Sequence, residues 1–334
     1  MRRLHAAVVL AVCTALLTPA TALAWSNGPA GPDEYGTHDW VLLEAKRIAV
    51  SNDVTWLDWA TAQPMTDDPD TVLHDTYHHV YDVWGDSTYG DAPTQIGTVY
   101  AQTVYQLRYN GKAEASKKMA LLAHYYADIC NPLHTDQTDA EDAIHGAYEQ
   151  DVDPLTDTMG ENRAWVAPGS MQYRYDIVGT SKSAATSAHG LYDRIISDYP
   201  VGGEPAIRDV TQWGLNRAAN DLADVIYSVQ RATKTKAHRT SCGVVNHYPP
   251  QYTTVKAISR VTDSAGRPIP GVKVSFRWKF KTVTHTMTSS TNAAGYAYCG
   301  RYISGAAKGY KVTITATATS AGETRSGATW FVPK

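Results

Sequence analysis

The chain has 334 residues, enough for two ordinary domains, and its formal net charge is only −3. No block of basic residues indicates nucleic-acid binding by electrostatics alone. No segment after the first 24 residues is apolar for long enough to span a bilayer, so the sequence gives no sign of an integral membrane protein.

The first 24 residues have the pattern of a secretory signal peptide. A basic start at residues 1–3 is followed by the apolar run 6–17 and by the small-residue site Ala22-Leu23-Ala24. We therefore expect a secreted, extracellular protein whose mature chain begins at Trp25.

Three cysteines follow the predicted cleavage site. In an oxidising compartment the simplest arrangement is one disulfide and one free thiol. Cys242 and Cys299 both lie in the C-terminal part, so we expect these two to pair. Cys130 is expected to be a buried thiol rather than a metal ligand.

Apolar residues recur at helical spacing through most of the N-terminal two thirds of the chain. Helices are expected over residues 37–49, 54–60, 94–108, 113–129, 140–150, 184–197 and 212–230. The segment 64–90 is expected to be rich in loops. The segment 151–179 has no visible period and cannot be assigned.

The pattern changes to a period of two beyond Pro250. Apolar residues from Val272 to Phe280 alternate with polar ones, as in strands with one buried face. Several such runs separated by turns predict a small β-sandwich. The predicted fold class is multidomain, with an all-α helical domain followed by an all-β, immunoglobulin-like sandwich. The expected boundaries are signal peptide 1–24, helical domain 25–236, linker 237–251 and β-sandwich 252–334.

Five potential metal ligands lie within one stretch of 26 residues. His124 and Asp128 are four residues apart, as are His145 and Glu149, so each pair can lie on one helical face. His134 follows an Asn-Pro dipeptide, where the first helix should end. One pair alone is more simply a surface contact. Two pairs with the histidine between them predict a metal site, and mixed imidazole and carboxylate ligands suit zinc.

These motifs resemble the zinc-dependent phospholipase C family, which shares its fold with the S1/P1-type nucleases. The resemblance covers about residues 25–230. It rests on Trp25 at the predicted mature N-terminus, on His38 in Gly-Thr-His-Asp-Trp, on His79 in His-Val-Tyr-Asp and on the 124–149 stretch. It implies a helical catalytic domain that binds three zinc ions per chain.

The resemblance also implies which residues hold each ion. The three implied ligand sets are Asp67 or Asp68 with His79, His124 and Asp128; Trp25, through its α-amino nitrogen and carbonyl oxygen, with His38 and a bridging Asp128; and His134, His145 and Glu149. Asp67 or Asp68 would also accept the proton of the attacking water. Asp70 likewise precedes His79, whereas His74 and His78 are expected to be solvated loop residues.

The closing His-x-x-x-Glu pair favours the phospholipase branch, because the nuclease branch ends in His-x-x-x-Asp. The resemblance thus implies a phospholipase C that releases diacylglycerol and a phosphorylated head group at a phospholipid membrane surface. We expect a monomer with no stable nucleic-acid partner. Two alternatives stay open: an S1/P1-type zinc nuclease or other phosphodiesterase, and an adhesion or binding protein with structural zinc.

Overall fold

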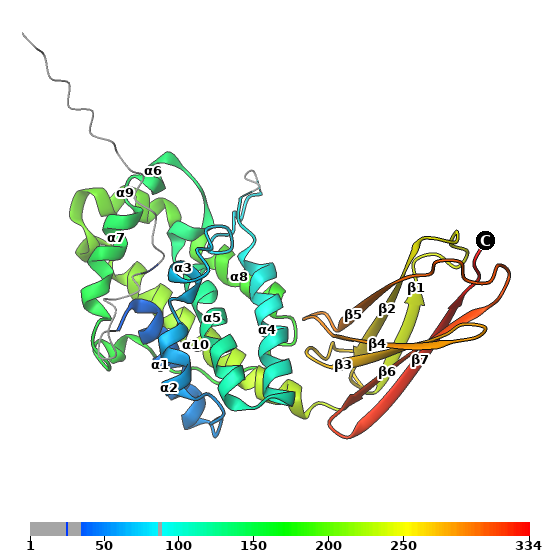
Figure 1. The fold of residues 1–334 in the computed structure, drawn as a ribbon. Helices are drawn as coiled ribbons and strands as arrows, with labels where there is room; N and C mark the ends of the chain where they lie inside the picture. The colour runs from blue at the N-terminus through cyan, green and yellow to red at the C-terminus, as the bar shows by residue number, and fades with distance from the viewer. Residues whose placement is uncertain (1–24, 26–34, 86–88) are drawn as a thin grey trace, which may run out of the picture.

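The computed structural model describes residues 25, 35–85 and 89–334, so the predicted signal peptide at 1–24 lies outside the described residues. Helices come first in the chain and strands follow (Figure 1). The α-helices are α1 (Thr37–Ser51), α2 (Trp59–Ala62), α3 (Asp68–Thr71), α4 (Ala92–Tyr109), α5 (Lys112–Asp128), α6 (Asp139–Asp142), α7 (His145–Val152), α8 (Ile177–His189), α9 (Tyr192–Gly202) and α10 (Arg208–Lys234). Short 3-10 helices are η1 (Gln63–Met65), η2 (Pro132–Thr135), η3 (Asp153–Leu155), η4 (Arg163–Trp165) and η5 (Glu204–Ala206).

The helical part is built around α10 and α5. α10 is 27 residues long and packs against α1, α4 and α5. The apolar positions that sequence periodicity assigned to it are all fully buried: Leu215, Ala218, Ala219, Leu222, Ile226 and Val229. Burial of such side chains, at about 1.5–3 kcal/mol each for the large ones, drives the bundle together. The predicted all-α architecture of this part is therefore confirmed.

Three predicted helices differ from the observed ones because tertiary contacts override the local pattern. Residues 54–58 are extended rather than helical, and Trp56 is buried there with its indole N–H donating to the carbonyl of Ile226 (2.9 Å). The predicted helix 140–150 is divided into α6 and α7. The predicted helix 184–197 is divided into α8 and α9 near Gly190, a residue type that commonly ends helices.

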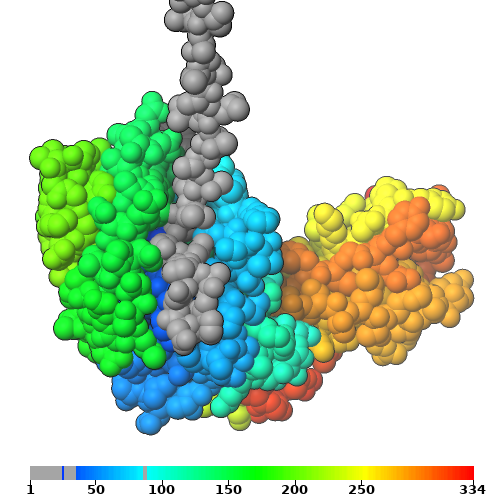
Figure 2. All heavy atoms as spheres, turned by 60° about the vertical axis from the view of Figure 1, so that its left-hand side comes forward, coloured from blue at the N-terminus to red at the C-terminus, as the bar shows by residue number. Residues whose placement is uncertain are grey.

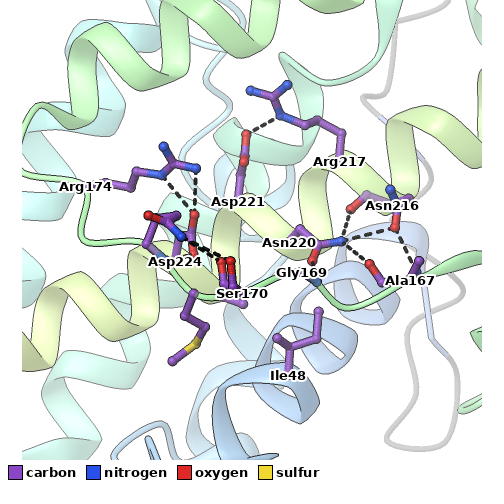
Figure 3. Close-up of a pocket in the computed structure, with 13 residues that line it drawn as sticks. Ile48, Ala167, Gly169, Ser170, Arg174, Asn216, Arg217, Asn220, Asp221 and Asp224 are labelled. Atoms are coloured by element: carbon purple, nitrogen blue, oxygen red, sulfur yellow. Dashed lines mark hydrogen bonds and ion pairs between the residues drawn. The ribbon is translucent and has the colours of Figure 1, made fainter. Parts of the chain in front are cut away.

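The aperiodic stretch before α8 forms an extended strap across α10 (Figure 3). Side-chain oxygens spaced four residues apart on α10 accept its backbone N–H groups. The contacts are Ala167 N–H to Asn216 (2.9 Å), Gly169 N–H to Asn220 (2.7 Å) and Gln172 N–H to Asp224 (2.6 Å). A pocket of about 360 Å³ lies beside the strap, lined by the ion pairs Arg174–Asp224 and Arg217–Asp221. Because these charged groups pair with one another, we interpret the pocket as part of the packing between the strap and α10 and not as a binding site.

The C-terminal part is a two-sheet antiparallel β-sandwich, as predicted. The strands are β1 (Arg239–Val244), β2 (Thr254–Thr262), β3 (Lys273–Lys279), β4 (Thr284–Ser290), β5 (Tyr296–Tyr302), β6 (Val312–Ser320) and β7 (Glu323–Phe331). They form sheets of order β1-β2-β5 and β4-β3-β6-β7, an arrangement of the immunoglobulin type. The core includes Phe276, Trp278 and Phe331. Residues 237–251, expected to be a linker, contain β1, which pairs along its whole length with β2.

The predicted disulfide between Cys242 and Cys299 is wrong, because Cys130, Cys242 and Cys299 are all free. Cys242 on β1 lies opposite Ser259 of β2, and Cys299 on β5 lies opposite Ala257 of the same strand. Strand β2 therefore separates the two cysteines. Neighbouring strands are about 4.8 Å apart, so two strand spacings give roughly 9–10 Å. Disulfides span Cα atoms only about 4.4–6.8 Å apart.

The sandwich packs against the C-terminal half of α4 (Figures 1 and 2). Arg108 donates to the carbonyl of Ala232 (2.8 Å) and to the hydroxyl of Ser320 on β6 (2.7 Å). Gly271 has a positive φ of 62°, and a Cβ there would lie 2.5 Å from the backbone nitrogen of Tyr105. None of the helices in the described residues is long and apolar enough to cross a membrane.

Candidate metal centre

Five separate elements bring the candidate ligands together. His38 lies in the first turn of α1, His79 in the loop after α3, and His134 in η2. His124 and Asp128 lie one helical turn apart on α5, and His145 and Glu149 lie one turn apart on α7. The Asn131 side chain accepts the backbone N–H of Leu133 (3.2 Å), which ends the α5 segment and starts η2 at Pro132. This turn places His134 beside the α5 ligands.

Asp128 faces two neighbouring groups of ligand atoms. Its Oδ1 lies 3.5 Å from Nε2 of His38, and its Oδ2 lies 2.8 Å from Nδ1 of His79 and 3.5 Å from Nε2 of His124. Asp70 completes the second group, with its two oxygens 3.4 Å from His79 and 3.5 Å from His124. The two oxygens of Asp128 thus face different imidazoles, Oδ1 towards His38 and Oδ2 towards His79 and His124.

The third group lies between η2 and α7. Nε2 of His145 is 3.2 Å from Nε2 of His134 and 2.9 Å from Oε1 of Glu149, while His134 is 3.4 Å from the same oxygen. All three side chains are buried. Each of the three groups can offer its ligand atoms to one metal ion: His38, His124 and Asp128; Asp70, His79 and His124; His134, His145 and Glu149.

Hydrogen bonds on the far side of the imidazoles fix their orientation. Nδ1 of His124 faces the carbonyl of Thr66 (2.7 Å), and Nδ1 of His134 faces the carbonyl of His79 (3.1 Å). A carbonyl can only accept, so Nδ1 carries the proton and Nε2 keeps its lone pair for a metal. Glu141 plays the same part for Nδ1 of His145. Sequence reasoning missed Glu141, although its position four residues before His145 was the available signal.

The pKa values show that the site cannot hold protons on all of its histidines. Burial, together with the charges of neighbouring imidazoles, holds the pKa of His38 well below its usual range and lowers the pKa of His134 to about 3. Burial also opposes protonation of His79 and His145. Their hydrogen-bonded carboxylates outweigh it and raise the pKa to about 9 for His79 and about 10 for His145. His38 and His134 are thus neutral near pH 7 and have a lone pair available for a metal ion.

The residues fit zinc on two observations. Tetrahedral zinc with Zn–N distances of 2.0–2.1 Å puts neighbouring ligand atoms about 3.3 Å apart. The His79–His124 and His134–His145 nitrogen pairs are each 3.2 Å apart. In addition, both ring nitrogens of His38, Oδ1 of Asp128 and Oε2 of Glu149 are buried without a hydrogen-bond partner. Buried polar atoms normally have partners, so these atoms point to an ion.

The structure separates the early aspartates. Asp70, rather than Asp67 or Asp68, contributes to a ligand group. Asp67 borders the group: its Oδ1 is buried without a partner, and burial plus the charges of Asp39 and Asp70 raises its pKa to about 8. Asp68 is half-buried, and burial raises its pKa too.

The remaining predicted positions lie around these groups. The Trp25 side chain is fully buried, and a Cβ added to Gly214 of α10 would lie 3.2 Å from its ring. His78 pairs with Asp75 (2.8 Å), and Nδ1 of His74 faces the backbone carbonyl of Asp70.

Comparisons with known proteins agree with the sequence motifs. No family model matches the chain. A phospholipase C of Listeria monocytogenes is 29% identical over 154 residues, which cover 40% of this chain and 53% of that protein. The chain therefore spans about half the length of the curated relative it matches.

Two solved structures are similar over most of the chain. An alpha toxin from Clostridium absonum matches with a TM-score of 0.45 and 13% identity, covering 91% of this chain and 99% of the toxin. A Clostridium perfringens alpha-toxin matches with a TM-score of 0.45 and 14% identity, covering 89% and 97%. The resemblance to phospholipase C that the motifs indicated is thus found by direct sequence comparison over 154 residues.

Proposed function

We propose that this chain is a secreted, zinc-dependent phospholipase C, which hydrolyses the phosphodiester bond of phospholipids to diacylglycerol and a phosphorylated head group. The observation that carries the proposal is the position of Asp128, whose two oxygens face separate groups of buried imidazoles. The sequence similarity to a phospholipase C supports the choice of substrate class.

In this proposal His38 and Asp128 hold one ion together with Trp25, Asp70 and His79 hold a second with His124 and Asp128, and the α7 group holds the third. Bound zinc ions supply Lewis acidity, which stabilises charge on phosphoryl oxygens and lowers the pKa of bound water. The chain itself orients the ligands through the carbonyls of Thr66 and His79 and through Glu141.

Among the described residues, Asp67 is the best-placed proton acceptor. It precedes Asp70 by three residues at the start of α3, so both carboxylates can lie on one side of that turn. Its partnerless Oδ1 is available to take the proton of an attacking water, and its raised pKa suits a general base near neutral pH.

The N-terminal amine of Trp25 becomes a ligand only after the signal peptide is cleaved, because an amide lone pair is delocalised into the peptide bond. A single Ala added before Trp25 leaves every side chain in place. We expect this extended protein to lose one zinc and most of its activity. Full zinc content and activity in the extended protein would rule out the N-terminus as a ligand.

The test of the function compares substrates with and without chelator. Purified protein beginning at Trp25 is assayed on mixed phospholipid vesicles and on single-stranded DNA, beside Asp128→Asn and the control Asp193→Asn, an exposed residue of α9. We expect the wild-type protein to release head groups, and we expect chelator to abolish this activity and added zinc to restore it. Asp128→Asn should lose the activity, whereas Asp193→Asn should keep it. Cleavage of DNA alone would instead make the protein a nuclease. Zinc binding without either activity would make it a binding protein.

A further inference from the structure

The overall charge of −3 conceals two oppositely charged parts. Residues 25–236 carry 31 Asp and Glu against 15 Lys and Arg, whereas residues 237–334 carry 13 Lys and Arg against only Asp263 and Glu323. The sandwich is therefore strongly cationic, and such an asymmetry indicates an anionic partner.

One outer face of the sandwich combines basic side chains with rows of hydroxyls. In the β4-β3-β6-β7 sheet the apolar residues of β3 and β6 point into the core, so the alternate residues form the outer face. The register aligns sixteen outer positions: Thr284, Thr286, Thr288, Ser290, Lys273, Ser275, Arg277, Lys279, Thr313, Thr315, Thr317, Thr319, Thr324, Ser326, Ala328 and Trp330. Eleven of them carry hydroxyls and three are basic, and none is acidic.

The basic residues lie between rows of hydroxyls. Arg277 lies opposite Thr286 on β4 and Thr315 on β6, and Lys279 lies opposite Thr284 and Thr313 in the same way. Arg277 and Lys279 are exposed and have no ion-pair partner among the described residues. Alternate positions along a strand are about 6.6–6.8 Å apart, so the face offers evenly spaced donors in a plane.

The composition of this face distinguishes among anionic partners. Membrane-binding surfaces insert apolar side chains, but here only Trp330 is large and apolar. Single-stranded nucleic acid is held by several stacking aromatic residues, which the face also lacks. Hydroxyl donors beside regularly spaced cations suit a polyhydroxylated chain with repeating negative charges.

We propose that the outer face of the four-stranded sheet binds a linear anionic polysaccharide, sulfated or carboxylated. This surface is separate from the metal centre and does not depend on the proposed lipase activity. Arg277 and Lys279 supply the charge contacts, and the flanking threonines supply hydrogen bonds to sugar hydroxyls.

The test uses protein beginning at Trp25 and fluorescent dextran sulfate as the probe. The variant R277Q/K279Q is compared with R239Q/K256Q, which removes two exposed charges from the outer face of the other sheet. We expect the first pair to weaken binding about tenfold, the loss of two exposed ionic contacts, and the second to weaken it less than twofold. Single R277Q covers the case in which the double variant misfolds.

Equal losses in both variants would overturn the proposal, because binding would then follow net charge rather than this face. Tighter binding to phosphatidylglycerol vesicles or to single-stranded DNA than to dextran sulfate would also overturn it. Chelator is present throughout, so no result depends on hydrolysis.

Discussion

Replacement of Glu141 tests whether the orientation of His145 matters for metal binding. Glu141 is almost fully buried on α6, and its carboxylate accepts the Nδ1 proton of His145 on α7. Glu141→Gln keeps an oxygen that can accept this hydrogen bond but removes the charge. Glu141→Ala removes both. The exposed Glu114, which pairs with Lys117 at 2.7 Å, provides the control Glu114→Gln.

Loss of a hydrogen-bond partner behind a metal-ligating histidine weakens metal binding about 10- to 100-fold. This corresponds to about 1.4–2.7 kcal/mol. We expect Glu141→Gln near the lower figure and Glu141→Ala near the upper one. Glu141 also favours protonated His145, whose pKa is raised to about 10. Below this pH a metal ion must displace that proton to bind His145. The difference in zinc affinity between the wild-type protein and the Glu141 variants is therefore smallest at low pH and grows as the pH rises.

The assay titrates chelator-treated protein with buffered zinc at pH 7 and at pH 9 and follows both bound metal and activity. Both Glu141 variants should need a higher free zinc concentration than the wild type to bind their weakest-held zinc ion. Excess zinc should restore most of their activity. Glu114→Gln should match the wild type. An unchanged zinc titration in Glu141→Ala would refute the argument that Glu141 orients a ligand.

Asp128→Asn should reduce kcat more than Glu149→Gln at saturating zinc, because one oxygen of Asp128 faces His38 and the other faces His79 and His124; equal losses would contradict the proposed bridging role. Gly214→Ala should destabilise the protein by about 1–3 kcal/mol in thermal unfolding, since its Cβ would lie 2.9 Å from the carbonyl oxygen of Cys130 and 3.2 Å from the Trp25 ring; an unchanged Tm would contradict this close packing. Burial raises the pKa of Cys242 to about 11, so its alkylation should be about 100-fold slower than that of an ordinary thiol at pH 8 and should quicken as the pH rises towards 11. Denatured protein beginning at Trp25 should show three free thiols, and a count of one would show that two of the cysteines form a disulfide after all.

The elements that were predicted well are those whose own sequence carries a complete signal. α5 and α10 have long apolar faces at helical spacing, and β3 alternates strictly. The two His-x-x-x-carboxylate pairs belong to the same class, because a helix alone brings residues four apart together. Local periodicity was therefore enough to place four of the ligands in facing pairs.

Features that depend on partners distant in sequence could not be predicted. The strap before α8 has no period because its hydrogen bonds go to Asn216, Asn220 and Asp224 on another element. The short pattern of β1 predicts a linker, whereas pairing with β2 stabilises this segment as a strand. The pairing of Cys242 with Cys299 failed for a related reason, since sequence proximity within a domain says nothing about the strand that separates them.

The aspartates before His79 show that a ligand set inferred by resemblance can be assigned to residues only when the local backbone conformation is known. Asp67 and Asp70 are three residues apart in a segment that the sequence predicts to be loop. In a loop, the spacing of two residues does not say whether their side chains lie on the same side. The structure makes it α3, with Asp67 at the N-cap and Asp70 inside the helix. One turn then places Asp70 within reach of His79 and His124. The carboxylate of Asp67 lies near that of Asp70, and its Oδ1 is buried without a partner. Two roles that the resemblance assigned to one residue, metal ligation and proton acceptance, can thus be divided between neighbours on one short helix. In that case Asp67→Asn should lower kcat while leaving the zinc content intact, whereas Asp70→Asn should lower both.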